Sequence, residues 1–137
     1  MKERIVQKIS KIRGYHALIT GMKEDCENKF VTGTIYRGAL LHYLYLIADT
    51  CITLAELLIK QKGLRPPQSY HEAFDILGEA RILRPDFAYS FANIAGFRNF
   101  LAHDYEHVEA ITICRNMLDR LGEVEVFCGQ AEGTLTE

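Results

Sequence analysis

The chain has 137 residues, which is enough for one domain with a single compact core. Hydrophobic residues make up 48% of it and charged residues 25%, as in ordinary soluble globular proteins. The net charge is −2 and the sequence pI is about 6.2, so no overall basic field attracts nucleic acid, and any phosphate attraction has to come from a local patch.

The first half of the chain predicts two helices. Residues 3–28 place apolar side chains at helical spacing, although two glycines weaken the pattern. A stronger helix runs from Thr32 or Thr34, either of which can cap it, to Lys62, where Gly63 stops it. Its apolar residues cover more than one face, which is typical of a central helix or of one shared with a partner.

The second half predicts three further helices. Ser69 and Glu72 have capping-box spacing and start a helix that ends before Pro85. The next begins at Pro85 or Asp86, and its phenylalanines and tyrosines are expected in the core. The last covers about residues 108–127.

These patterns define the fold class. We expect an all-α, single-domain antiparallel bundle of about five helices over residues 1–128. Residues 129–137 have no periodicity and are expected to form a frayed tail.

The cysteines and the most apolar stretch bear on location. The four cysteines contain no Cys-x-x-Cys pair, and the N-terminus has no signal-peptide pattern, so a reducing cytoplasm is the expected setting. Residues 39–59 are interrupted by polar and charged side chains, including His42 and Asp49, which argues against a membrane span.

One polar motif stands inside an otherwise apolar helical pattern. Residues 96–105 contain Arg98, Asn99, His103 and Tyr105. The forked guanidinium of arginine suits a phosphate or its transition state, and histidine can give and take a proton near neutral pH. Together these groups indicate phosphodiester cleavage on RNA, in which the substrate's own 2′-hydroxyl attacks and neither a metal nor a protein nucleophile is needed.

Helix geometry separates two members of this motif. On an ideal helix Arg98 and His103 point about 140° apart, whereas Asn99 and His103 share a stripe. Either the helix loosens near His103, or the same motif from a second subunit completes the site across a two-fold axis.

Simpler interpretations of the same residues remain open. His103 could bond a carbonyl at a helix end beside a solvated Arg98, and Tyr105 could anchor that end. His103 and His107 have a spacing that two zinc ligands can use, but no third ligand is evident, so no metal is expected. Asp49 lies in the most apolar helix, where an acid is usually paired or at the surface.

The motif also carries a family resemblance. Arg98, four residues, His103, one residue and Tyr105 resemble the Arg-x4-His-x-Tyr signature of HepT-like toxins, a branch of the HEPN superfamily of helical ribonucleases. The flanking segments 64–77 and 96–99 resemble the matching family segments, and the resemblance can be followed over about residues 35–128.

The resemblance implies a function and partners. A HepT-like protein would be an endoribonuclease toxin and a homodimer whose Arg98/His103 sets line the interface cleft, and it would leave a 2′,3′-cyclic phosphate. A minimal nucleotidyltransferase antitoxin would silence it by attaching AMP to Tyr105. Asn99 would support the site, and Asp49, where relatives tend to carry Glu, would orient Arg98 or His103.

A function of another class uses the same residues. The chain could be a non-catalytic helical module that binds a nucleotide or a nucleotidyltransferase and holds phosphate with Arg98. The acidic pI slightly favours it. Removing His103 separates the two hypotheses, because only catalysis requires a proton-transfer group. Neither hypothesis calls for a cofactor.

Overall fold

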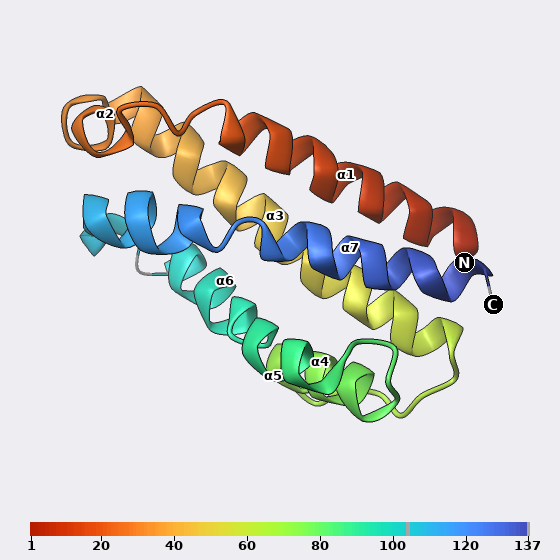
Figure 1. The fold of residues 1–137 in the computed structure, drawn as a ribbon. Helices are drawn as coiled ribbons and strands as arrows, with labels where there is room; N and C mark the ends of the chain where they lie inside the picture. The colour runs from red at the N-terminus through yellow and green to blue at the C-terminus, as the bar shows by residue number, and fades with distance from the viewer. Residues whose placement is uncertain (104, 137) are drawn as a thin grey trace.

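The computed structural model of the protein describes residues 1–103 and 105–136, except for the side chain of Tyr105. These residues form an all-α, single-domain bundle, which confirms the predicted fold class (Figure 1). In chain order its elements are α1 (Lys2–Thr20), α2 (Cys26–Thr32), α3 (Thr34–Gln61), α4 (Tyr70–Glu79), α5 (Pro85–Phe91), α6 (Ile94–His103), η1 (Tyr105–His107), η2 (Thr112–Met117), α7 (Glu123–Gly133) and η3 (Thr134–Thr136).

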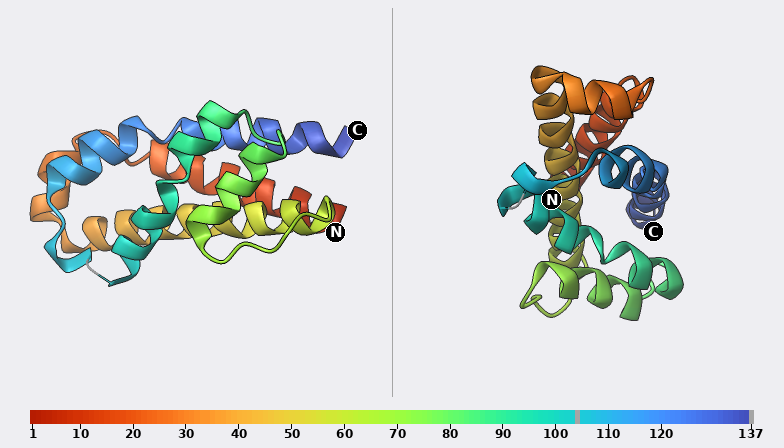
Figure 2. Two further views of the ribbon diagram at one scale, coloured as in Figure 1. Left: turned by 90° about the horizontal axis from the view of Figure 1, so that it is seen from below. Right: turned by 90° about the vertical axis from the view of Figure 1, so that its left-hand side faces the viewer.

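Helix α3, with 28 residues, is the centre of the fold. Helix α1 runs alongside it in the opposite direction, α4 to α6 pack on another side, and α7 lies between α1 and that second group (Figures 1 and 2). All seven α-helices contribute buried side chains to the core, and α3 contributes the most. The two termini lie at one end of the molecule, while α2 and the segment of residues 105–119 lie at the other (Figure 1).

The ends of α3 differ in how well the sequence predicted them. Gly63 has a φ of +65°, a left-handed conformation suited to glycine, so it ends the helix as predicted. The predicted threonine cap is wrong, because Gly33 occupies the N-cap position and no side chain caps α3. The hydroxyl of Thr32 instead donates to the carbonyl of Asn28, 2.9 Å away, within α2.

The helix predicted over residues 3–28 is divided into α1 and α2. Helix α1 ends at Thr20, and Asp25 takes the left-handed conformation with a φ of 54°, which interrupts the helical path. The chain then starts α2, which buries Cys26 and Phe30 against the core. The turn therefore adds apolar contacts at the end of the bundle that α1 does not reach.

The predicted Ser69 cap at the start of α4 is confirmed, and the reciprocal bond of the capping box is shifted by one residue, to Gln68. The Ser69 hydroxyl accepts a hydrogen bond from the Glu72 amide at 3.0 Å. In return, the Glu72 carboxylate accepts one from the amide of Gln68 at 2.9 Å. Pro85 stands in the first turn of α5, also as predicted.

The helix predicted from Pro85 into the motif is divided into α5 and α6. The break at residues 92–93 leaves Phe91 packed against two core rings, with centroids 5.5 Å from Phe74 and 5.1 Å from Phe127. The expectation that the aromatic residues here are core holds for Phe91 but is wrong for Tyr89, which is 81% exposed.

The C-terminal region departs most from the prediction. The helix expected over residues 108–127 is a π-helical segment, a turn and the first part of α7. The expected frayed tail is wrong for residues 129–136, because α7 continues to Gly133 and buries Ala131. An ion pair of 2.7 Å between Glu132 and Arg13 of α1 also holds this end. Residue 137 lies outside the described part.

The expectation of reduced cysteines is wrong for two of the four, because a disulfide joins Cys26 of α2 to Cys114 of the π-helical segment, with Cα atoms 5.8 Å apart. The other two cysteines are buried thiols. Burial raises the pKa of Cys51 well above its ordinary value and that of Cys128 to about 12, so both stay protonated at neutral pH.

By length and composition α3 could cross a bilayer, and it is the one helix in the described residues of which this is true. The central helix of a helical bundle meets the same test, and half of the apolar stretch is buried inside the protein. The position of α3 in the core accounts for its apolar character.

Candidate functional site

The side chain of Arg98 reaches from α6 to α3 and is held there by polar contacts. Its Nε donates to Oδ1 of Asp49 at 3.1 Å, and its Nη2 donates to the hydroxyl of Tyr45 at 3.1 Å. Its Nη1 donates to Oδ1 of the neighbouring Asn99 at 3.2 Å. Asp49 thus contacts Arg98, which is one of the two partners that the sequence suggested for it.

Two tyrosine rings enclose the same guanidinium. The Cζ atom of Arg98 lies 5.2 Å from the ring centroid of Tyr45 on α3 and 5.2 Å from that of Tyr70 on α4. The Arg98 side chain is only 18% exposed. Burial by itself lowers the pKa of Arg98, but the hydrogen bond to Asp49 and the two phenols outweigh it and raise the pKa, so the side chain remains a cation.

This arrangement orients Arg98 without using all of its donors. A guanidinium has five N–H groups, and Asp49, Tyr45 and Asn99 each take one. The described residues therefore leave one N–H free on each terminal nitrogen. Donors on two neighbouring nitrogens can bind two oxygens of one phosphate.

His103 does not share this enclosed environment. It is the last residue of α6 and is exposed, as is Asn99 one turn earlier. Helix α6 stays α-helical through His103, so it does not loosen before that residue. Arg98, facing α3, and His103, on the exposed stripe, therefore diverge by about the 140° of an ideal helix. Asn99 connects the two stripes, since it accepts from Arg98 and lies one turn from His103.

The remaining motif positions are described only in part. The backbone of Tyr105 begins the short helix η1, but its side chain lies outside the described part, so the contacts of this predicted modification site are not described. His107 ends the same helix and is exposed. No three His, Cys, Asp or Glu side chains among the described residues come together as metal ligands.

Sequence reasoning missed two members of the site. Tyr45 is four residues before Asp49 on α3, so the two share a stripe, and this spacing was the available signal. Tyr70 comes from α4, and only the packing of α4 near α6 brings it to Arg98. A cavity of about 650 Å³ adjoins the motif, and Tyr45, Leu101, Ala102 and Glu106 are among its lining residues.

Comparison with known proteins defines the class. The model of the family described as ribonuclease HepT-like matches residues 5–131, so the chain belongs to the ribonuclease HepT-like family. One curated relative is the mRNA nuclease HepT of Shewanella oneidensis, which is 22% identical over 127 residues, covering 93% of this chain and 95% of the relative.

Solved structures share the fold. A toxin of a mutant MntA–HpeT toxin–antitoxin pair superposes with a TM-score of 0.83 at 21% identity, covering 94% of this chain and 98% of the other. A tri-AMPylated Shewanella oneidensis HEPN toxin in complex with MNT antitoxin has a TM-score of 0.80 at 20% identity, covering 97% and 99%. YutE of Bacillus subtilis, a cytosolic protein of unknown function, has a TM-score of 0.77 at 17% identity, covering 98% and 90%.

Proposed function

We propose that the chain is a metal-independent endoribonuclease toxin of a toxin–antitoxin pair, acting in the cytoplasm, with Arg98 and His103 as its catalytic residues. The observation that carries the proposal is the guanidinium of Arg98, which three neighbours fix and which keeps two N–H donors free of any partner among the described residues. The curated relative named as an mRNA nuclease supports the choice of RNA as substrate.

The reaction needs only one base and one cation. His103 accepts the proton of the substrate's 2′-hydroxyl while that oxygen forms a bond to the adjacent phosphorus. The bond from phosphorus to the 5′-oxygen breaks, and a solvent proton completes the leaving 5′-hydroxyl. The strand is left with a 2′,3′-cyclic phosphate. Arg98 offsets the charge that develops on the phosphoryl oxygens.

We further propose a homodimer in which Arg98 of one copy works with His103 of the other. Because α6 is regular through His103, the two side chains diverge within one copy. A two-fold axis near the motif brings the exposed stripe of one copy towards Arg98 of its partner. The exposed amide of Asn99, held by Arg98, would lie in the same cleft and support the phosphate.

Regulation would act on the residue two positions after His103. We propose that a minimal nucleotidyltransferase antitoxin attaches AMP to Tyr105. A nucleotide there would occlude the site, and its phosphate would compete for the free donors of Arg98. The tri-AMPylated toxin among the solved structures supports this proposal.

The first experiment is RNA cleavage by the purified protein in excess EDTA, with intact mass showing that Tyr105 is unmodified. We expect cyclic-phosphate ends from the parent and none from His103→Ala or Arg98→Ala. His107→Ala is the matched control, since it removes another exposed histidine close by. An unmodified parent that cleaves no RNA would favour the rival function, a non-catalytic module, to which the net charge of −2 is better suited.

Mixing the two inactive variants tests the dimer. If the site combines Arg98 of one copy with His103 of the other, a mixed dimer contains one intact site. Equal mixing should then restore about a quarter of the parent activity, because about half of the dimers are mixed and each has one of two sites. If mixing restores nothing while size measurements show that mixed dimers form, the two residues act within one copy.

A further inference from the structure

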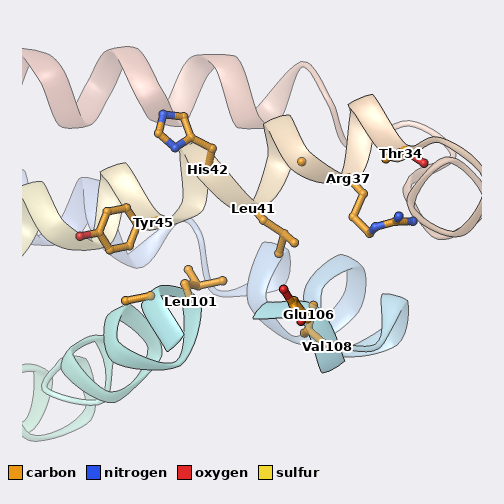
Figure 3. Close-up of a pocket in the computed structure, with 10 residues that line it drawn as sticks. Thr34, Arg37, Leu41, His42, Tyr45, Leu101, Glu106 and Val108 are labelled. Atoms are coloured by element: carbon orange, nitrogen blue, oxygen red, sulfur yellow. The ribbon is translucent and has the colours of Figure 1, made fainter. Parts of the chain in front are cut away.

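The cavity beside the motif is not explained by phosphate cleavage alone. It measures about 650 Å³, within the range of roughly 300–1,000 Å³ typical of small-molecule sites. One wall is a stretch of α3, and the other is formed by Leu101 and Ala102 at the end of α6 and by Glu106 and Val108 after it (Figure 3). The cavity therefore starts next to His103 and extends away from it.

Arg98 and the cavity meet at one residue. Tyr45 lines the cavity, and its hydroxyl accepts a hydrogen bond from Arg98 at 3.1 Å. Arg37, Leu41, Tyr45 and Asp49 follow one another every four residues along α3, so they form one slowly winding stripe. That stripe runs for about 18 Å, from Arg37 at the far end of the cavity to Asp49 beside Arg98.

The groups that line the cavity suit different parts of a nucleotide. Figure 3 shows Arg37 and Tyr45 towards opposite ends of the α3 wall, with Leu41 between them, Thr34 beyond Arg37, and Leu101 and Val108 on the opposite wall. A phenol ring and apolar side chains can contact the face of a base, and a guanidinium can bind a phosphate. His42 also borders the cavity, but its exposed ring points away from Leu101 and Val108 (Figure 3).

The guanidinium of Arg37 has N–H groups that are not used within the described residues and could bind a phosphate. In the described residues only its Nη1 donates, to the carbonyl of Phe30 at 2.9 Å and, more weakly, to that of Val31 at 3.5 Å. The guanidinium also lies over the Phe30 ring, 6.0 Å from its centroid. Neutral partners hold the side chain in place, and no carboxylate in the described residues pairs with it, whereas Arg98 forms an ion pair with Asp49.

Glu106 sets the orientation of the ligand. Its carboxylate lies across the cavity from Leu41, between the Arg37 and Tyr45 ends of the α3 wall (Figure 3), and would repel a phosphate placed beside it. It can instead accept a hydrogen bond from the amino group of adenine or cytosine. The phosphate therefore belongs at the Arg37 end and the edge of the base near Glu106.

We propose that this cavity is a subsite for single-stranded RNA, which holds a nucleotide next to the scissile phosphate through Arg37 and the ring of Tyr45. The inference rests on the proposed ribonuclease function and deepens it. The same nucleotide chemistry could come from AMP attached to Tyr105, so the test uses protein whose mass shows it to be unmodified.

The test compares Arg37→Gln with Arg4→Gln. Glutamine removes the charge but keeps a donor for the Phe30 carbonyl, so the fold is retained, and circular dichroism melting checks this. Arg4 is exposed on α1 at the opposite end of the molecule, so its replacement changes the net charge equally far from the cavity. Binding is measured by fluorescence anisotropy with a short 2′-O-methyl oligonucleotide of mixed sequence, which cannot supply the attacking hydroxyl.

We expect Arg37→Gln to weaken binding about tenfold and to reduce the slope of log affinity against log salt by about 0.7. In cleavage assays KM should rise while kcat stays unchanged, because Arg37 does not touch the reacting atoms. Arg4→Gln should behave as the parent does.

Other results overturn the inference in distinguishable ways. If the parent cleaves RNA and Arg37→Gln binds the oligonucleotide equally well, the subsite is refuted while the proposed function stands. If Arg37→Gln slows only the adenylylation of Tyr105 by a nucleotidyltransferase, the cavity serves AMP and not RNA. If the unmodified parent neither binds nor cleaves RNA, both proposals fail.

Discussion

Replacing Asp49 by asparagine removes the negative charge beside Arg98 while keeping an oxygen at nearly the same place. The bond from Nε of Arg98 to Asp49 is 3.1 Å long, between side chains that are 18% and 42% exposed. A fully exposed pair contributes about 0–1 kcal/mol and a charged hydrogen bond about 1.5–3 kcal/mol, so a half-exposed pair is worth about 1–2 kcal/mol. If that energy holds Arg98 in its reactive orientation, kcat should fall about 5- to 30-fold.

The assay is single-turnover formation of the 2′,3′-cyclic phosphate, with Asp75→Asn as the control. Asp75 is 41% exposed and lies 3.2 Å from His71, so it is a carboxylate of similar exposure and pairing away from Arg98. We expect Asp75→Asn to leave kcat unchanged. Adding Asp49→Asn to an Arg98→Lys variant should lower kcat little further, because lysine lacks the forked donors that Asp49 orients. An unchanged kcat in Asp49→Asn, or equal losses in both backgrounds, would refute the positioning role.

Three further predictions concern stability. Gly78→Ala should destabilise by about 1–3 kcal/mol in urea unfolding, since a Cβ there would stand 2.8 Å from Cβ of Ala88, whereas Gly129→Ala, with nothing within 4 Å, should not destabilise. Reducing the disulfide, which spans 88 residues, should lower the free energy of unfolding by up to about 4–5 kcal/mol, and a Cys26→Ala/Cys114→Ala variant should lose its response to reductant. The hydrogen bond from Arg13 lowers the pKa of Glu132 below its ordinary 4.5. The contribution of this ion pair to the free energy of unfolding is therefore complete above pH 4.5 and is lost as the pH falls through the lower folded-state pKa. In Arg13→Gln, the free energy of unfolding should change less with pH over this range.

Local chemistry made parts of the fold predictable. The Ser69 cap and the stop at Gly63 depend on neighbouring residues, and both are confirmed. The breaks that divide the longer helices depend instead on packing between distant parts of the chain. An aspartate can adopt the left-handed conformation in many contexts, so Asp25 alone does not predict a break. The turn is favourable here because it allows Cys26 and Phe30 to be buried against the core, which the local sequence does not reveal.

The candidate site shows the same division. The sequence identified Arg98 and singled out Asp49 as an acid that needed a partner, and the structure joins them. Tyr70 could not be foreseen, because its contact with Arg98 depends on how α4 packs near α6. The tail was misjudged because residues 129–136 lack a regular apolar stripe, although Ala131 and Thr134 are buried and Glu132 pairs with Arg13 of α1.

The acidic pI and an RNA substrate are compatible because charge is distributed unevenly. Arg13 is paired with Glu125 and Glu132, each at 2.7 Å, so it adds little to the field around the molecule. Arg37 is held by carbonyls and a ring, and its charge is available at the cavity. Affinity for RNA should therefore depend on a few phosphate contacts near the motif, with a shallow salt dependence, and not on a broad basic surface. A steep salt dependence that Arg37→Gln leaves unchanged would mean that RNA binds elsewhere.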